Sequence, residues 1–313
     1  MSLETIIVND ENTFDVLIIG SGPAGLTAAL YTSRAGFKTG FIERSTPGGK
    51  VTTLKNVTNF PGIDHISGSS LSLNFFKQAK TYGAKYLYGN VTRISKKMGY
   101  FSVSTQENDL WLAKVIIIAT GVEDIKLDCP NAKNFEKIGI SYCATCDGYL
   151  TKNKKVVVVG NNEEAISTSI FIASLAKQVT LVYLGKIENK DVLNNSKNTI
   201  TIKENVKINN VYGSSFKLEG ITLINEKGSE KINCDFIFVN LGVTPAVSFL
   251  SEFKEIINSE GIIETNENKQ TKINGIYAVG DVSKTLNRQI ITAANDGAIA
   301  GISVVEYLNL FKK

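Results

Sequence analysis

The sequence has very little arginine and histidine. Four of its 34 basic residues are arginines (Arg34, Arg44, Arg93 and Arg288), and none occurs between Arg93 and Arg288. His65 is the single histidine. Catalysis or metal binding that needs several histidines therefore has little support. For most of the chain, the same holds for a bidentate arginine contact to a phosphate.

The chain also lacks long apolar runs and an excess of charge of one sign. Runs such as 115–119 and 156–159 are far shorter than the ~18 residues of a membrane-spanning helix. The 34 basic and 30 acidic residues are dispersed and leave a net charge of +4, which argues against a nucleic-acid-binding surface. The first residues include Glu4, Asp10 and Glu11, with neither a basic leader nor an apolar segment. We therefore expect no signal peptide and a cytoplasmic protein.

A glycine-rich turn follows the first predicted strand. Residues 15–20 are apolar and β-branched, and the segment after Gly20 favours a helix. Gly20, Gly22 and Gly25 complete the pattern G-x-G-x-x-G, which permits a tight turn, close approach of a pyrophosphate and close packing of helix on strand. A second strand over 38–43 ends at Glu43, 23 residues after Gly20, where a ribose-binding acid is expected. These features favour a dinucleotide-binding unit over a purely structural glycine turn.

A second unit with the same order begins at Lys155. We expect a strand over 155–160, a helix over 163–176 and a strand over 178–183. Asn162 replaces the second glycine, Glu163 and Glu164 add negative charge at the helix end, and Tyr183 occupies the place of the ribose-binding acid. Two interpretations stay open: a working nucleotide site, and a retained scaffold whose nucleotide site is weakened or lost.

Further strands are predicted over 115–121, 236–242 and 275–281. The first and third would continue the sheet of the N-terminal unit, so that the second unit is inserted into the first. We therefore expect an α/β protein with two Rossmann-like dinucleotide-binding domains, the first formed by residues 1–121 and 243–313 and the inserted one by 122–242. The lysine- and asparagine-rich stretch 186–210 is predicted to form loops and edge strands.

Cys143 and Cys146 form a Cys-x-x-Cys pair, which indicates redox chemistry or metal binding in a chain with only four cysteines. A pair at this spacing can form a small, reducible ring. Half of a zinc site is disfavoured, because Cys129 and Cys234 are single and irregularly spaced. We expect those two to be small buried apolar residues rather than redox partners. Asp147 can move the proton that thiolate chemistry requires, and a helix cap is the alternative role.

These motifs resemble those of the low-molecular-weight thioredoxin reductases, which are class II FAD-dependent pyridine nucleotide-disulfide oxidoreductases. The resemblance extends over nearly the whole chain and is most specific in the string SYCATCDG at 141–148. It implies an FAD-binding first domain, an inserted NAD(P)H-type domain and a homodimer. It also implies that Cys146 is the sulfur nearer the flavin, that Cys143 attacks a thioredoxin-like partner and that Asp147 donates a proton. The residues it implies in FAD binding are Gly20, Ser21, Gly22, Pro23, Ala24, Gly25, Glu43, Gly49, Lys50, Thr53, Asn59, Ala119, Thr120, Gly121, Gly280, Asp281, Arg288, Gln289 and Ile290.

Two departures from the family pattern concern the flavin and the electron donor. Lys50 stands where members usually have glutamine beside the flavin. The family's glycine- and arginine-rich NADPH motif is replaced by the turn 160–165 and by a segment that offers Lys186 and Asn189 but no arginine. The donor is then weakly bound NADPH, NADH, or a protein such as ferredoxin.

The resemblance therefore predicts an FAD-dependent disulfide oxidoreductase that reduces a thioredoxin-like protein. Two alternatives are an FAD-dependent dithiol oxidase and a flavin-binding redox sensor without turnover. Relatives of the oxidase kind tend to have histidine after the second cysteine, so Asp147 argues against the oxidase.

Overall fold

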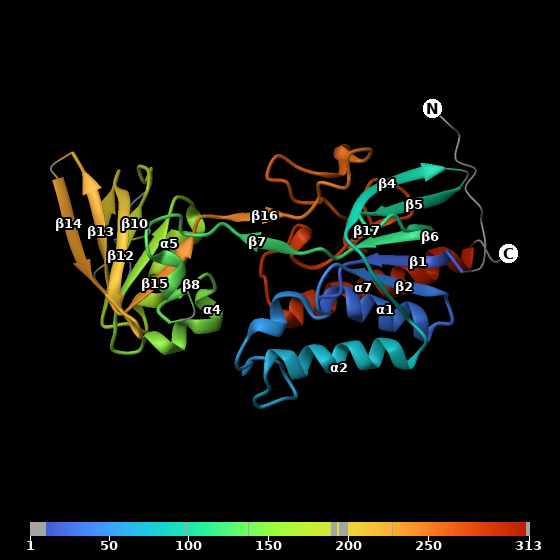
Figure 1. Cartoon of the computed structure of the whole chain (residues 1–313), viewed down its shortest axis with the longest axis horizontal. Helices are drawn as coiled ribbons and strands as arrows, with labels where there is room; N and C mark the ends of the chain where they lie inside the picture. The colour runs from blue at the N-terminus through green and yellow to red at the C-terminus, as the bar shows by residue number, and fades with distance from the viewer. Residues whose placement is uncertain are drawn as a thin grey trace. The chain divides into compact units, whose positions relative to one another are not determined.

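The computed structural model describes residues 11–97, 99–136, 138–188, 193, 200–226 and 228–310. The chain divides into two compact units, one made of Met1–Glu123 with Pro245–Lys313 and the other of Asp124–Thr244. It passes from one unit to the other through β7 (Val122–Asp124) and back through β16 (Val243–Pro245), which pair as a two-stranded sheet (Figure 1). Gly121 and Gly242, with φ of 67° and 93°, precede these strands in a left-handed conformation that favours glycine.

The first unit contains a seven-stranded sheet of mixed direction. β1 is parallel to β2 and β6, and β17 is parallel to β6, so a strand near the C-terminus joins the N-terminal sheet as the sequence predicts. β4, β5 and β6 form an antiparallel meander, which the sequence analysis did not predict. The strands are, in spatial order, β3 (Lys85–Tyr88), β2 (Thr39–Glu43), β1 (Thr13–Ile19), β6 (Leu110–Ile118), β5 (Tyr100–Thr105) and β4 (Val91–Lys97), with β17 (Ile276–Ala278) against β6.

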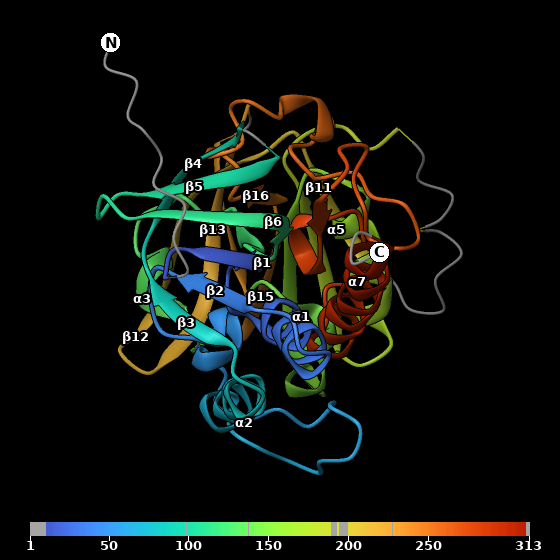
Figure 2. The ribbon, with the colours of Figure 1, turned by 90° about the vertical axis from the view of Figure 1, so that its right-hand side faces the viewer.

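Alternating side chains of β1 enter two apolar cores, as expected for a central strand covered on both faces. Val16 and Ile18 pack with α1 (Pro23–Arg34) and α7 (Ile290–Leu310), whereas Leu17 and Ile19 pack on the opposite face. α1 and α7 lie side by side against the sheet (Figure 2), and α2 (Gly68–Thr81) packs against α1. The sheet and these helices hold the amino end of α1 next to the carboxyl end of β1.

The second unit repeats this arrangement on a smaller scale. The five strands of its larger sheet are all parallel. α5 (Glu163–Ala173) covers the face of this sheet that carries Val156 and Val158. The other face packs against a three-stranded antiparallel sheet, which the sequence analysis did not predict. The parallel strands are, in spatial order, β11 (Ile200–Glu204), β10 (Gln178–Tyr183), β9 (Lys155–Gly160), β15 (Phe236–Asn240) and β8 (Ile140–Ser141); the added sheet is β12 (Lys207–Ser214), β13 (Lys217–Asn225) and β14 (Gly228–Asn233).

The predicted fold class is confirmed, and the expected elements shift by a few residues. α5 ends at Ala173 rather than at 176, because Ala176 forms a bridge with Lys152 and the chain turns there into β10. The predicted strand 275–281 is shorter, since Gly280–Val282 forms the 3₁₀ turn η4. Of the stretch 186–210, β11 lies at the edge of its sheet, as expected. Residues 189–192 and 194–199 lie outside the described residues.

Gly25 offers a direct test of the close packing between α1 and β1. A Cβ at Gly25 would lie 2.1 Å from the carbonyl oxygen of Gly20, whereas a Cβ at Gly22 would have no heavy atom within 4 Å. Gly25→Ala should therefore lower the free energy of unfolding by about 1–3 kcal/mol. Gly22→Ser, which introduces a favourable N-cap residue into open space, should change it by less than ~0.5 kcal/mol.

The measurement is urea unfolding followed by the fluorescence of Trp111, the single tryptophan, which lies in β6 of the first unit. Equal stability of the Gly25→Ala and Gly22→Ser proteins would contradict the inferred packing.

Candidate active site

Cys143 and Cys146 are joined by a disulfide, with their Cα atoms 5.3 Å apart. They lie on the short helix α4 (Ala144–Asp147) and its N-cap position, directly after β8. β8 is parallel to β15, with Ile140 opposite Ile237, so the disulfide follows the carboxyl end of a strand. This is the edge of an open α/β sheet at which functional groups usually lie. Both cysteines are half-buried, and the disulfide agrees with the interpretation of the pair as a redox centre.

The main chain around the pair supports negative charge on one sulfur. The Cys146 N–H donates a hydrogen bond to Cys143 Sγ at 3.2 Å, and Thr145 Oγ1 lies 3.6 Å from the same sulfur. The Cys143 N–H donates to Ser141 Oγ at 3.1 Å, which fixes the residue before the helix. N–H donors placed in this way would stabilise a thiolate at Cys143.

Asp147 is tied to the segment that carries Cys143. Ser141 Oγ donates a 2.6 Å hydrogen bond to Asp147 Oδ2, and the Asp147 N–H donates to the Cys143 carbonyl at 3.1 Å. Asp147 occupies the N-cap position of the following 3₁₀ turn η2 (Gly148–Thr151) without a side-chain hydrogen bond to that turn, and its roles as helix cap and as proton carrier both stay predictions. The carboxylate is thus held beside the redox pair, where a proton carrier is needed. Ser141, which is 7% exposed, was not singled out from the sequence, although it belongs to the same string.

Tyr142 anchors the segment before Cys143. Its hydroxyl donates to Glu136 Oε1 at 3.0 Å and accepts from the Leu127 N–H at 3.4 Å, while Lys126 Nζ lies 3.9 Å from the centre of its ring. Burial is the main cause that raises the pKa of Tyr142, and the neighbouring Glu136 adds to it. The phenol therefore stays protonated and serves as a hydrogen-bond donor that fixes the backbone. Sequence reasoning missed this residue as well.

The glycine-rich turn of the first unit leaves the amino end of α1 open. Gly22 is the N-cap, no side chain caps the helix there, and Pro23 fills the first turn. The first hydrogen bond within the helix runs from the Leu26 N–H to the Gly22 carbonyl at 2.9 Å. Since a Cβ at Gly22 would meet nothing within 4 Å, space remains in front of the positive helix end. This turn fits the pyrophosphate of FAD.

Glu43 lies beside this turn at the end of β2. Its Oε2 accepts hydrogen bonds from the Ser21 N–H at 3.1 Å and from Ser21 Oγ at 2.9 Å. Its Oε1 accepts from the Ser45 N–H at 3.0 Å. The four-donor environment, completed by Ser45 Oγ at 3.3 Å, keeps the carboxylate fixed next to the glycine turn. A fixed acid at this point suits the ribose of a dinucleotide.

Other residues implied in FAD binding gather near the same turn. A Cβ at Gly49 would lie 3.4 Å from Gly22 Cα, and one at Gly280 would lie 3.0 Å from Ala24 Cβ. A Cβ at Gly20, with φ of 99°, would lie 2.4 Å from the Ala119 carbonyl oxygen. These approaches place the loops after β2, β6 and β17 next to the amino end of α1.

The other residues implied in FAD binding either join distant parts of the sequence or face solvent. Asn59 Nδ2 donates to Gln289 Oε1 at 3.1 Å, across 230 residues of sequence. Arg288 is exposed, and in the described part of the chain no residue pairs with it. The remaining members are Lys50 and Thr53 in the exposed 3₁₀ turn η1 (Gly49–Thr53), Thr120, whose hydroxyl donates to the Ala246 carbonyl at 3.0 Å, Gly121 before β7, Asp281 in η4, and Ile290 at the start of α7.

The corresponding turn of the second unit is closed by its own side chains. Asn162 Oδ1 accepts a hydrogen bond from the Ala165 N–H at 3.1 Å and so caps α5. Glu163 and Glu164 are exposed in the first turn of the helix, where they add negative charge. β10 ends at the half-buried Tyr183. The Ala165 N–H in the first turn of α5 is therefore already bonded within the chain. Lys186 is exposed, and Asn189 lies outside the described residues.

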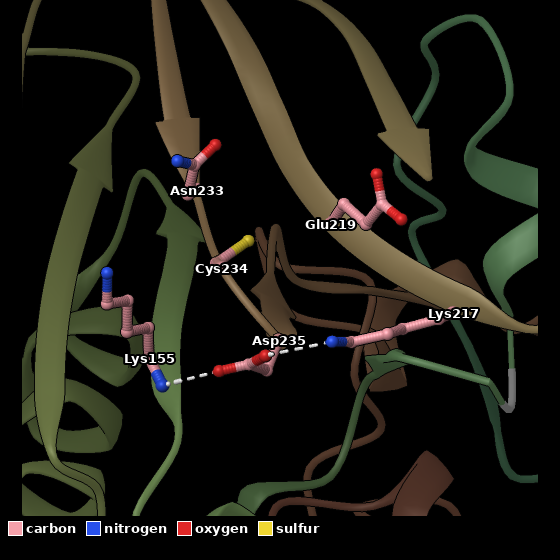
Figure 3. A pocket seen from close by; sticks show the side chains of 6 residues that line it. All are labelled: Lys155, Lys217, Glu219, Asn233, Cys234 and Asp235. Carbon is pink, nitrogen blue, oxygen red and sulfur yellow. Dashed lines mark hydrogen bonds and ion pairs between the residues drawn. The ribbon is translucent and has the colours of Figure 1, made fainter. Parts of the chain in front are cut away.

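The two remaining cysteines are separate from the redox pair. Cys234 is 4% exposed, and burial raises its pKa to about 12. Burial also raises the pKa of the half-buried Cys129. Cys234 lines a cavity of about 210 Å³ at the amino end of β9, the edge of the sheet opposite the disulfide (Figure 3). The other lining residues are Lys155, Lys217, Glu219, Asn233 and Asp235.

Asp235 contacts two other residues of this cavity. Asp235 accepts a hydrogen bond from the Lys155 main-chain N–H at 3.0 Å and lies 4.0 Å from Lys217 Nζ. In the described ranges, no helix is both long and apolar enough to cross a membrane. The redox disulfide and the glycine-rich turn of the first unit are the chemically distinctive features of the chain.

Comparison with known proteins agrees with this reading of the site. Residues 14–297 match the family of pyridine nucleotide-disulphide oxidoreductases. The chain is 37% identical over 309 residues to the thioredoxin reductase of Bacillus subtilis (strain 168), and the match covers 96% of each protein. It superposes on the crystal structure of thioredoxin reductase from Streptococcus pyogenes MGAS5005 with a TM-score of 0.88 and 33% identity, covering 95% of this chain and 99% of that one.

A ferredoxin-flavin thioredoxin reductase from Clostridium acetobutylicum matches with a TM-score of 0.52 and 28% identity, covering 95% of this chain and 99% of that one. The matches extend over both compact units. The chain belongs to the pyridine nucleotide-disulphide oxidoreductase family and is an oxidoreductase of the low-molecular-weight thioredoxin reductase type.

Proposed function

We propose that this protein is an FAD-dependent disulfide oxidoreductase that reduces a thioredoxin-like protein through Cys143 and Cys146. The observation that carries the proposal is the Cys143–Cys146 disulfide, with Asp147 held beside it by Ser141. The glycine-rich turn and Glu43 of the first unit supply a fitting dinucleotide site. Relatives named thioredoxin reductase match both units and support the same function.

The proposed reaction is an exchange of thiols and a disulfide. Bound FAD would supply the two electrons that convert the Cys143–Cys146 disulfide to a dithiol. Cys143 Sγ, stabilised as a thiolate by the Cys146 N–H, attacks the partner disulfide and forms a mixed disulfide, and one partner thiolate leaves. Cys146 Sγ then attacks Cys143 Sγ, which reforms the original disulfide and releases the second partner thiol. Asp147 delivers the proton that a departing thiolate takes up.

The contrast between the two helix ends bears on the electron donor. α1 begins with an uncapped glycine, whereas α5 is capped by Asn162 and begins with Glu163 and Glu164. We infer that NADPH and NADH bind weakly and that a reduced protein of the ferredoxin kind is the donor. The similarity to a protein named ferredoxin-flavin thioredoxin reductase supports this inference.

We further propose that the protein acts in the cytoplasm and forms a homodimer. A dithiol relay that reduces a partner disulfide suits a compartment that keeps thiols reduced, and the described chain also contains two free cysteines. The homodimer is the state that the resemblance to the family implies.

Replacing one cysteine at a time should separate the two sulfur roles. Cys146→Ser leaves Cys143 free to attack but removes the sulfur that resolves the mixed disulfide. It should form a stable covalent complex with a thioredoxin whose single reactive cysteine carries 5-thio-2-nitrobenzoate. The measurement is release of the coloured thiol together with a complex on a non-reducing gel. Cys143→Ser is the matched control, and a stable complex with that variant instead would reverse the roles.

Asp147→Asn should slow partner reduction by roughly 10²–10⁴-fold, because the amide can still accept the hydrogen bond from Ser141 but carries no transferable proton. The measurement is single-turnover reduction of thioredoxin by the two-electron-reduced protein. Asp128→Asn, which removes an exposed carboxylate from the same unit, serves as the control. Unchanged turnover in Asp147→Asn would exclude the proposed role.

The donor is tested by anaerobic titration of the FAD-loaded protein with NADPH, NADH and reduced ferredoxin, followed at the flavin absorbance band. The arginines of the family's NADPH motif are missing here. If two charge-assisted contacts to NADPH are lost with them, this protein should bind NADPH roughly 10²–10⁴-fold more weakly than family members that have the motif. Asn162→Gly/Glu163→Ala, which opens the end of α5, should strengthen NADPH binding. Reduction of the flavin by sub-millimolar NADPH at the rate of turnover would restore an ordinary NADPH-dependent reductase.

A further inference from the structure

A buried ion pair lies in the first unit, outside the residues implied in FAD binding. Lys269 Nζ is 2.7 Å from Asp296 Oδ1, and the two side chains are 16% and 8% exposed. Among the ion pairs of the described residues, this is the pair most shielded from water; the pair Lys114–Asp15, for comparison, has exposures of 51% and 25%. Removing either partner of a largely buried ion pair leaves the other charge uncompensated, which is strongly destabilising.

The second carboxylate oxygen of Asp296 holds the start of η4. Asp296 Oδ2 accepts a buried hydrogen bond from the Gly280 N–H at 3.3 Å. Gly280 has a φ of 69° and approaches the first turn of α1, where a Cβ would lie 3.0 Å from Ala24 Cβ. Asp296 itself lies on α7, which packs along α1. One carboxylate therefore connects α7 to the backbone immediately before Asp281.

Lys269 connects the same carboxylate to the carboxyl end of β17, just before Gly280. Its carbonyl oxygen accepts a hydrogen bond from the Ala278 N–H at 3.0 Å, and its own φ is 61°, a left-handed conformation rare for lysine. The side chain of Lys269 thus contacts Asp296, and its main chain is bonded to the strand that leads into Gly280. Without the ammonium group, Asp296 would be an uncompensated buried charge and the hold on the Gly280 N–H would loosen.

We propose that the Lys269–Asp296 ion pair positions the Gly280–Asp281 segment against the amino end of α1 and thereby sets how tightly the protein retains FAD. This inference rests on the proposed role of Gly280 and Asp281 in FAD binding. Lys269 and Asp296 are positioning residues, because they act on that site through the Gly280 backbone.

The experiment measures the equilibrium and the rate of FAD release by the increase in flavin fluorescence. Lys269→Met should raise the dissociation constant roughly 10- to 100-fold, as expected for the loss of a charge-assisted contact. Lys269→Arg, which restores the charge, should recover most of the affinity. Lys114→Met removes a lysine from an exposed ion pair in the same unit and should leave FAD binding unchanged.

A double variant tests whether the two residues act together on FAD binding. Because Lys269 and Asp296 act as one unit, Lys269→Met/Asp296→Asn should weaken FAD binding by less than the product of the two single effects. If Lys269→Met fails to fold, the decision passes to Asp296→Asn, whose amide oxygen can still accept from Gly280 and which should release FAD faster than the wild type.

Folded Lys269→Met or Asp296→Asn protein with wild-type FAD affinity, whatever its unfolding midpoint, would overturn the inference. A wild-type protein that takes up no FAD on reconstitution would overturn the proposed function, and this inference with it. The two failures are therefore distinguishable from the wild-type measurement alone.

Discussion

The close approach of α1 to β1 is the constraint on which the rest of the first unit depends. Gly20 and Gly25 have no side chains at the point of contact, and a methyl group at Gly25 would collide with the Gly20 carbonyl. This contact sets the direction of α1 and brings its amino end to the end of the sheet. Glu43 at the end of β2, Gly49 in the loop that follows it, and the Gly280 turn after β17 then lie near that helix end. The cofactor site is thus assembled around a backbone contact that only glycine permits.

The second unit has the same strand–turn–helix–strand order with a different turn at its helix end. Gly160 still packs tightly at the end of β9, where a Cβ would lie 2.3 Å from Ala165 Cβ. Two residues later Asn162 caps α5 with its side chain, so the helix end is satisfied internally rather than by a ligand. The parallel sheet is unchanged by this, because its stability comes from apolar strands such as β9 and β15 rather than from the turn.

The redox pair depends on a different and more local set of interactions. The two cysteines follow a strand of only two residues, β8, whose position is fixed by its pairing with β15. Ser141 Oγ donates to Asp147 and accepts from the Cys143 N–H, and Tyr142 donates to Glu136, so the segment is held on both sides of Cys143. A reactive disulfide on a short helix is in this way supported by the rigid sheet beneath it.

The sequence by itself determined the features that rest on local chemistry. The apolar β-branched runs, the G-x-G-x-x-G turn and the Cys-x-x-Cys string predict β1, α1, β2 and the redox pair, because strand periodicity, glycine turns and cysteine spacing are short-range properties. The repeat of the strand–turn–helix–strand order also predicts the second parallel sheet. The loss of the second glycine at Asn162 is visible without any structure.

Only the tertiary structure decided which distant side chains meet. Lys269 lies in a polar stretch typical of a solvated turn, and Asp296 lies within a helix, yet folding buries them together. The contact of Asn59 with Gln289 and the packing of the β12, β13 and β14 sheet on its neighbour likewise depend on how the elements pack. Contacts of this kind are set by long-range burial and by the satisfaction of buried polar groups, for which a single sequence carries no periodic signal.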